Sequence, residues 1–238
     1  MKKTQWMEFI NKYYLSGECE SVILEVENKQ MKCKFVNENK TVLGSVTLNS
    51  TTMADGNLGV YNTSSLLKIL TALDDEIDIK YESRDEKLTK ILISDKTIAA
   101  EFVLADPDII PEVPSMKNNP EEDLMFEFTP DLIDKFNKSN NALPDAASFA
   151  ILTTDTGISM VLNYSELATN RIEIAIPKVL KVTDIDVIYF PAKLFQNIIN
   201  ANKNSSKCVI KVSSQGLATI AFKSETFTSI YYLVRTVA

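Results

Sequence analysis

The feature of this sequence that most limits its fold is a helical pattern that occurs twice at one interval. Four short segments place apolar residues at the spacing of an amphipathic helix, and they begin near residues 4, 62, 130 and 191. The first two lie 58 residues apart and the last two 61, while the first and third lie 126 apart and the second and fourth 129. We therefore expect two similar domains of about 120 residues instead of one large domain.

The starts of three of these helices carry ordinary capping chemistry. Asn62 offers a side-chain oxygen to the first turn of the second helix, and Thr129 does so for the third, with Pro130 at its first position. Pro191 opens the fourth helix. These residues predict where the helices begin.

The segments between the helices are predicted to be strands, because polar and apolar residues alternate in runs such as 21–26. Late in each half a hairpin is expected, residues 88–93 with 97–102 and residues 209–212 with 217–222, and these two hairpins are matched to one another. The fold class predicted is α+β, with two helices packed on antiparallel sheets in each domain.

A connector is expected between the two domains. Residues 105–114 contain three prolines and lead into a polar, acidic stretch, which argues against a regular helix or strand. Its apolar residues Ile109, Ile110 and Val113 indicate that the connector packs on a domain surface. The predicted boundaries are 1–105 for the first domain, 106–123 for the connector and 124–238 for the second domain.

The charge of the chain is divided unevenly. The total is −7, but the helical segments, taken as residues 1–16, 62–73, 130–140 and 191–204, carry a net charge of +5 and leave −12 for the remainder. A surface of lysines attracts the phosphate backbone of a duplex without reading its sequence, which favours duplex DNA as a partner. The lysines are Lys2, Lys3, Lys12, Lys68, Lys135, Lys138, Lys193 and Lys203, against Glu8, Asp131 and Asp134.

The helical period also predicts where these lysines point. Lys68, Lys138 and Lys193 fall opposite the apolar faces of their helices, whereas Lys12, Lys135 and Lys203 lie about 110° away. All are expected to face away from the core, although any amphipathic helix places lysine on its solvated side. Asp131 and Asp134 cancel the two lysines of the third helix, which weakens Lys135 and Lys138 as DNA contacts.

The chemistry of most enzymes is missing. The chain has no histidine, and its six glycines form no phosphate-binding loop with a following lysine. The acidic runs 74–76 and 184–186 are interpreted as solvated charges at the ends of elements, and no metal or cofactor is expected. We therefore expect a non-enzymatic binding or scaffolding protein.

The sequence also bears on the cellular compartment. No apolar stretch reaches 18 residues, and the first residues lack the apolar core of a signal peptide. The three cysteines, Cys19, Cys33 and Cys208, are unevenly spaced and are expected to be buried, reduced thiols. A cytosolic protein with no membrane partner is expected.

Short sequence motifs across nearly the whole chain are similar to those of a known family. The run Gly59-Val-Tyr-Asn-Thr-Ser-Ser-Leu-Leu-Lys-Ile-Leu70 is followed by Asp74-Asp75, a hairpin, and Leu104-Ala-Asp-Pro107 entering the connector. Leu132 to Lys138 and the helix after Phe190-Pro191 occupy the matching places in the second half. In these features the chain resembles the DNA polymerase sliding clamps of T-even-like tailed bacteriophages, which share the fold of the eukaryotic clamp PCNA.

The resemblance implies a homotrimeric ring of six clamp domains, with helices lining a hole for duplex DNA and sheets forming the outer wall. A clamp loader would open the ring and the replicative DNA polymerase would ride on it, in the cytoplasm of an infected bacterial host. The eight helical lysines would face the DNA. The alternative is a duplicated-domain trimeric viral structural or assembly protein with no DNA role, which would have no reason to keep its helices basic.

The resemblance also implies two protein-binding surfaces. Partner peptides would bind beside the connector, in a pocket formed by Ile109, Ile110, Val113 and Leu233. Subunits would join through edge strands, with residues 97–104 of one chain beside residues 171–176 of its neighbour. The interface residues expected are Thr97, Ala99, Glu101, Val103, Arg171, Glu173 and Ala175.

Overall fold

The structure is a computed structural model that describes residues 2–84, 87–115, 120–155, 157–165, 167 and 170–237. Its contacts divide the chain into two compact units. The first comprises Met1–Glu38, Leu43–Pro114 and Glu225–Ser229, and the second comprises Asn39–Val42, Ser115–Ser224 and Ile230–Ala238. The main division between the units therefore falls within the predicted connector.

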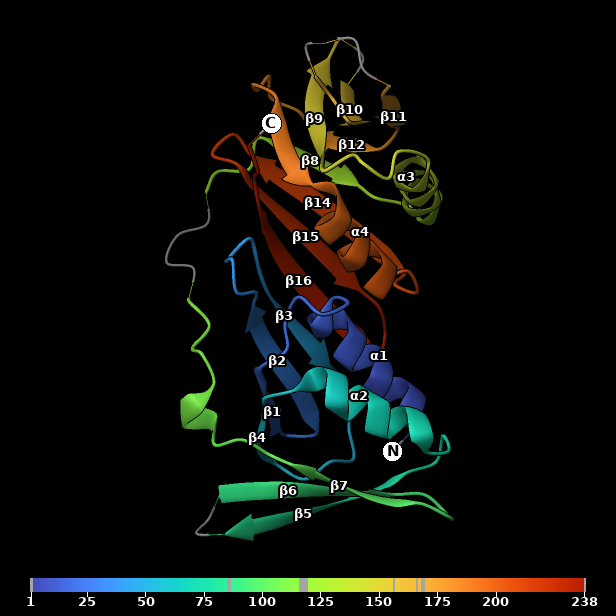
Figure 1. Cartoon of the computed structure of the whole chain (residues 1–238). Coiled ribbons are helices and arrows are strands. Elements are labelled where there is room, and N and C mark those ends of the chain that lie inside the picture. Colours follow the sequence, from blue (N-terminus) through green and yellow to red (C-terminus); the bar gives the residue numbers. More distant parts are fainter. Residues whose placement is uncertain are drawn as a thin grey trace. The chain divides into compact units, whose positions relative to one another are not determined.

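The first unit contains two helices and two groups of antiparallel strands. Helices α1 (Lys3–Tyr14) and α2 (Thr63–Ala72) lie side by side across a sheet ordered β3-β2-β1-β4 (Figure 1). A separate three-stranded sheet has the order β5-β6-β7. The strands are β1 (Val22–Glu27), β2 (Gln30–Val36), β3 (Val42–Leu48), β4 (Gly56–Val60), β5 (Asp78–Arg84), β6 (Lys87–Ser94) and β7 (Ala99–Val103).

The second unit has the same kind of organisation. Helices α3 (Pro130–Ala142) and α4 (Ala192–Ala201) lie beside strands ordered β11-β10-β9-β13 and β12-β8-β14-β15-β16. Its strands are β8 (Leu124–Glu127), β9 (Ser148–Thr154), β10 (Gly157–Leu162), β11 (Ile172–Ile176), β12 (Val179–Lys181), β13 (Ile188–Pro191), β14 (Lys207–Ser213), β15 (Leu217–Lys223) and β16 (Phe227–Val234), of which residues 230–234 belong to this unit.

The helix starts are held by the predicted caps. The side-chain oxygen of Asn62 accepts a hydrogen bond from the N–H of Ser65 at 2.8 Å, and the Thr129 hydroxyl oxygen accepts one from the N–H of Leu132 at 3.4 Å. Pro130 is the first residue of α3, and Pro191 immediately precedes α4. The three predicted helix starts are therefore confirmed, because capping depends on residues close in sequence.

Each unit has an aromatic or aliphatic core beneath its helices. In the second unit, the rings of Phe136 and Phe149 each lie with their centroid 4.8 Å from that of Phe195, and 5.2 Å from each other. In the first unit, Trp6 and Phe9 of α1 are completely buried. These buried rings fix how the helices sit on their own sheets, since aromatic burial contributes strongly to core packing.

The duplication is clearest after the second helix of each unit. Helices α2 and α4 begin at residues 63 and 192, which is 129 residues apart. Strands β5, β6 and β7 begin at residues 78, 87 and 99, and β14, β15 and β16 begin at 207, 217 and 227, so their offsets are 129, 130 and 128. Residues 88–93 in β6 thus correspond to β15. The hairpin match made from sequence paired residues 88–93 with residues 209–212 of β14, which was wrong by one strand. Period-two alternation is the same in every strand and does not distinguish neighbouring ones.

Among its described residues, 106–115 and 120–123, the connector contains one short regular element that its prolines did not predict. Residues Pro107–Ile109 form a 3-10 helix, η1, after Asp106. The Asp106 carboxylate accepts a hydrogen bond from the N–H of Asp108 at 3.1 Å, and Pro107 supplies a fixed φ at the first position. The expectation that this stretch holds no regular element is therefore wrong for these three residues.

Candidate nucleic-acid interface

The observed helix ends reduce the positive charge assigned to the helices. Lys2 precedes α1, and Lys203 follows α4, which ends at Ala201 instead of continuing to residue 204. Within the observed bounds, the helices hold six lysines and three acidic residues, a net charge of +3, which leaves −10 for the remainder of a chain whose total is −7. The separation of sign persists but is smaller than the sequence suggested.

Four helical lysines are exposed: Lys135, which is paired with Asp131, and the three predicted to lie opposite the apolar faces of their helices. Lys68 of α2, Lys138 of α3 and Lys193 of α4 are all exposed. In the part of the chain that the structure describes, no ion pair engages any of these three ammonium groups. They are the helical cations best placed to meet a polyanion.

Lys12 does not face solvent, so its assignment to a DNA-facing surface was wrong. Its side chain is 1% exposed, its Nζ lies 3.3 Å from the carboxylate of Glu8, and the same atom lies 4.9 Å from the centroid of the Phe227 ring. Burial lowers the pKa of the Lys12 ammonium, and Glu8 opposes that shift. A long aliphatic stem lets this lysine join the core while an acid on the same helix balances its charge.

Lys2 and Lys3 fasten the start of α1 to the end of α2. The Lys3 ammonium donates to the carbonyl oxygen of Leu73, at the C-terminal end of α2 where a cation is favourable. The N–H of Thr4 donates to Asp75 Oδ1 at 2.9 Å, and this bond contributes most to the lowered pKa of that carboxyl. Lys2 pairs with Glu76 through an isolated β-bridge. Within the acidic run 74–76, the Asp75 carboxylate therefore caps the first turn of α1, and the run lies at the end of an element.

On α3, acidic residues offset the lysines as the sequence indicated. Lys135 Nζ lies 2.7 Å from Asp131 Oδ2, one helical turn away. Lys138 forms no such pair with a described residue, and Asp134 is exposed on the same helix. The helix as a whole carries no net charge.

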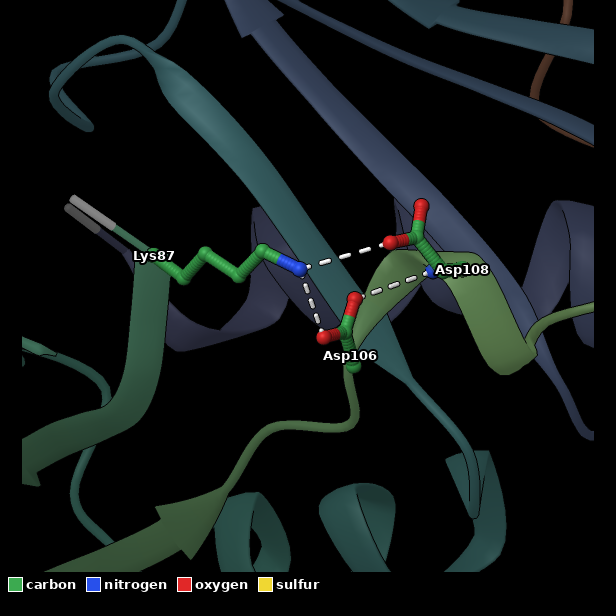
Figure 2. A network of polar contacts seen from close by, with 3 residues as sticks. All are labelled: Lys87, Asp106 and Asp108. Atoms are coloured by element: carbon green, nitrogen blue, oxygen red, sulfur yellow. Dashed lines mark hydrogen bonds and ion pairs between the residues drawn. The ribbon is translucent and has the colours of Figure 1, made fainter. Parts of the chain in front are cut away.

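The beginning of the connector is tied to the first unit. The N–H of Ala105 donates to the carbonyl oxygen of Gly59 at 2.8 Å, and Ile110 is buried next to this contact. Lys87 Nζ reaches Asp106 Oδ2 at 2.7 Å and Asp108 Oδ2 at 3.3 Å (Figure 2). The packing of the connector on a domain surface, which Ile110 suggested, is therefore present at this end.

The four residues predicted to form a partner-peptide pocket differ in how far they are exposed to solvent. Ile109 is 64% exposed, Val113 is half-buried and Ile110 is buried. Leu233 is completely buried in β16 and cannot line a surface pocket. The assignment of Leu233 was therefore wrong, because successive side chains of a strand point to opposite faces.

A cavity of about 200 Å³ lies on the outward side of that strand, within the second unit. Ile230 and Tyr232, which alternate with the buried Tyr231 and Leu233, contribute to its wall. Glu122, at the end of the connector, also lines the cavity, and its carboxylate accepts from Lys211 Nζ at 2.7 Å. Alternation in residues 227–234 is the sequence signal that could have selected Tyr232 instead of Leu233.

The two strands expected at a subunit interface, β7 and β11, are both edge strands in the structure. The N–H of Leu104 donates to the carbonyl oxygen of Thr89 at 2.8 Å, so the even-numbered residues of β7 are those that bond to β6. The backbone groups of Ala99, Glu101 and Val103 therefore point to the open edge.

The ends of the predicted interface segments need two adjustments. Thr97 lies in the turn before β7, where its N–H donates to Asp95 Oδ1 at 2.7 Å. Arg171 lies just before β11, with its guanidinium 5.9 Å from the centre of the Tyr164 ring. Glu173 and Ala175 are exposed residues of β11.

Other functional groups are accounted for as follows. Cys19, Cys33 and Cys208 are buried and unpaired, as expected, and burial raises the pKa of Cys19 to about 12. Over the described ranges, no group of three or more acidic or cysteine side chains is placed to bind a metal ion. None of the described helices combines the length and apolarity needed to cross a bilayer.

Comparison with known proteins identifies the fold. No protein-family model and no curated protein sequence matches the chain. Among solved structures, the chain is similar to Proliferating Cellular Nuclear Antigen from Entamoeba histolytica, with a TM-score of 0.73 and 15% sequence identity over 100% of this chain and 97% of that one. At this identity the likeness concerns the fold, and it confirms the predicted α+β clamp architecture of two helices on antiparallel sheets.

Proposed function

We propose that this protein is a sliding clamp, which encircles duplex DNA and tethers a replicative DNA polymerase without catalysing a reaction. The observation that carries the proposal is the set of exposed lysines, Lys68, Lys138 and Lys193, on the helices of an otherwise acidic chain with a PCNA-like fold. Helices with a net charge of +3 attract a duplex, while the remainder, at −10, repels it.

The chemistry of such a surface suits sliding. Lysine ammonium groups contact phosphates, which repeat along every duplex, and these contacts carry no sequence information. Each can be exchanged for the next phosphate at little cost. A closed ring would prevent dissociation while the individual contacts stay weak.

The ring would be a homotrimer formed through the open edges of β7 and β11. Three copies would place a charge of +9 on the helices and −30 elsewhere, from the +3 and −10 of each chain. At physiological salt these charges act over about 8 Å, so the helices would influence only DNA that passes close to them. No metal or cofactor has a part in this arrangement.

The polymerase and a clamp loader are proposed to attach through short peptide segments at the cavity beside the connector end. Ile230 and Tyr232 offer it an apolar wall, and Lys211 offers a cation paired with Glu122. The resemblance in sequence to T-even-like bacteriophage clamps makes the cytoplasm of an infected bacterium the proposed location, with no membrane partner.

The test is charge reversal on the helices. Lys68→Glu combined with Lys193→Glu should lower loader-dependent polymerase processivity by about tenfold or more, because each change replaces an attraction for phosphate by a repulsion. The control pair, Lys29→Glu with Lys207→Glu, makes the same change in net charge at exposed positions outside the helices and should leave processivity near wild type. Equal processivity in both double variants would remove Lys68 and Lys193 from the DNA path, and a wild-type protein that does not raise processivity at all would favour a trimeric structural or assembly protein with no DNA role.

A further inference from the structure

A seam of amide side chains joins the two helices of the second unit. Asn137 Nδ2 donates to Asn200 Oδ1 at 2.7 Å, and Gln196 Nε2 donates to Asn141 Oδ1 at 3.3 Å. Both bonds cross from α3 to α4, and each helix supplies its residues one turn apart. The seam is therefore a regular feature of this pair of helices.

The seam also holds one of the exposed lysines. Lys193 Nζ donates to Gln196 Oε1 at 3.2 Å, while the amide nitrogen of Gln196 is bound to Asn141. Gln196 is buried, so its side chain is fixed between these two partners. The Lys193 ammonium is consequently held beside the seam instead of sampling all its rotamers.

The bonds of the seam have a direction. The side-chain oxygens of Asn141 and Asn200 accept the bonds from Gln196 and Asn137, and both asparagines are exposed. No described residue accepts a bond from their NH₂ groups. Each NH₂ group carries two donor hydrogens, and these remain for solvent or a ligand.

We propose that this seam, formed by Asn137, Asn141, Gln196 and Asn200, makes uncharged contacts to the phosphate oxygens of the duplex through the outward NH₂ groups of Asn141 and Asn200. This inference rests on the proposed function and specifies how the second unit takes part in it. Phosphate oxygens only accept hydrogen bonds, and the outward groups of the seam, together with Lys138 and Lys193, only donate them. The seam thus accounts for how α3, which has no net charge, contributes to a surface for a polyanion.

Salt dependence separates amide contacts from lysine contacts. A lysine that neutralises a phosphate releases a counterion, so its loss lowers the slope of log affinity against log salt by about 0.9 for each contact. A neutral amide releases none, so its loss lowers affinity at every salt concentration and leaves the slope unchanged. A merely structural role would not produce this difference.

The experiment measures binding of the full-length protein to a fluorescent linear DNA duplex by anisotropy, from about 50 to 200 mM salt. Asn141→Ala with Asn200→Ala should weaken binding about tenfold with an unchanged slope, because two neutral hydrogen bonds are lost. Lys138→Gln should weaken binding and lower the slope. Gln215→Ala, which removes an exposed amide from the β14–β15 turn, is the matched control and should bind as wild type.

A second pair guards against loss of structure. Asn141→Asp with Asn200→Asp keeps the oxygens that accept from Gln196 and Asn137, so the seam persists, but it replaces the outward donors by acceptors. This pair should bind more weakly than the alanine pair while unfolding at a similar urea concentration. If the protein with Asn141→Ala and Asn200→Ala bound the duplex as tightly as the wild type, while Lys138→Gln still weakened binding, the proposal for the seam alone would be overturned. Absence of duplex binding by the wild-type protein at every salt concentration would overturn the seam as a phosphate contact, whereas the proposed function is overturned by a wild-type protein that does not raise loader-dependent processivity.

Discussion

Gly59 and Ala105 lie so close that no side chain fits between them. A Cβ atom on Gly59 would meet the carbonyl oxygen of Ala105 at 2.2 Å, and the hydrogen bond from the Ala105 N–H to the Gly59 carbonyl holds the two backbones together. Gly59→Ala should therefore lower the free energy of unfolding by about 1 to 3 kcal/mol, since backbone must move to relieve the overlap. Urea unfolding would measure this loss.

Asn57→Ala provides the control for this change, because Asn57 is an exposed residue of the same strand, β4. Its effect should stay within about 0.5 kcal/mol. A Gly59→Ala protein as stable as the Asn57→Ala protein would show that Ala105 is not held against β4.

Lys12→Met tests the burial of this lysine. The pKa of the Lys12 ammonium is lowered in the folded state, so between this lowered pKa and the usual value of 10.5 the unfolded chain holds more protons. The charged form thus opposes folding at neutral pH, and stability should rise as pH rises through the lowered pKa towards 10.5. Lys12→Met should remove this rise and change the unfolding free energy at neutral pH by about 1 kcal/mol or less, because an apolar chain of similar volume replaces the ammonium.

Lys12→Met should also leave polymerase processivity unchanged, in contrast to charge reversal at Lys68. A loss of processivity without a loss of stability would return Lys12 to the DNA-facing set. The two measurements therefore separate a core role from a contact with DNA.

Asp95 gives the fold an acid-sensitive turn. Its carboxylate accepts hydrogen bonds from the N–H groups of Asp74, Thr97 and Ile98, at 2.7 to 2.8 Å, which lower its pKa to about 2. Because the unfolded value is 3.8, the stabilisation from this carboxylate is fully present above about pH 4 and is lost as pH falls towards 2. Asp95→Asn should lower stability at neutral pH and flatten its dependence on pH in this window.

Urea midpoints measured at neutral pH and near pH 2.5 would test this window around the folded and unfolded values. Asp55→Asn, in an exposed turn before β4, is the control. If Asp95→Asn and wild type lose the same stability on acidification, the three N–H groups do not favour the ionised carboxylate.

Glu101→Pro tests the proposed edge of β7. The N–H of Glu101 points away from β6, so proline removes a donor from the open edge and spares the β6–β7 ladder. We expect the variant to stay folded and to fail to assemble. Light scattering should give three times the 26.6 kDa chain mass for the wild type and the single chain mass for Glu101→Pro.

Glu101→Ala separates backbone from side-chain effects. It keeps the N–H and removes only the exposed ion pair with Lys90, in which Nζ and the carboxylate oxygen lie 2.9 Å apart. Exposed pairs contribute little, so this variant should assemble as the wild type does. A trimer that survives the proline change would place the subunit contact elsewhere.

Side chains alternate between the two faces of β16, so substitutions of two adjacent residues should have opposite effects. Tyr232→Ala removes part of the cavity wall and should weaken polymerase binding by about tenfold or more, with little change in stability, because aromatic residues in such pockets often dominate binding. Leu233→Ala removes a fully buried side chain and should cost about 2 to 5 kcal/mol of stability. Titration calorimetry and urea unfolding would compare the two.

Thr228→Ala, on the same outward face of β16 but away from the cavity, is the control for Tyr232→Ala. It should bind the polymerase as wild type does. Equal losses in both variants would indicate a general effect on the strand, and undisturbed binding by Tyr232→Ala would remove the cavity from the proposed partner site.

The parts of the structure that the sequence predicted are those set by neighbouring residues. The caps at Asn62 and Thr129 act over three residues, and the helical period identified the faces of Lys68 and Lys193 correctly. Lys12 escaped prediction because its burial involves Phe227, which is distant in sequence. Leu233 was misplaced because an error of one residue exchanges the two faces of a strand.

The amide seam escaped prediction for another reason. Asparagine and glutamine add nothing to a count of charges, and the bond between Asn137 and Asn200 joins residues 63 positions apart. Only packing of α3 against α4 brings them together. A search for uncharged donors on the polar faces of both helices could have suggested them.

The open edge of β7 has a consequence for a newly made chain. Unless a second chain covers them, as in the proposed ring, the outward N–H and C=O groups of Ala99, Glu101 and Val103 can pair with any extended peptide, which is how unprotected sheets begin to aggregate. Val103 adds an exposed apolar side chain to that edge. Closure of the proposed ring would therefore also protect the protein from aggregation, since only an incomplete assembly leaves the edge of β7 open to other strands.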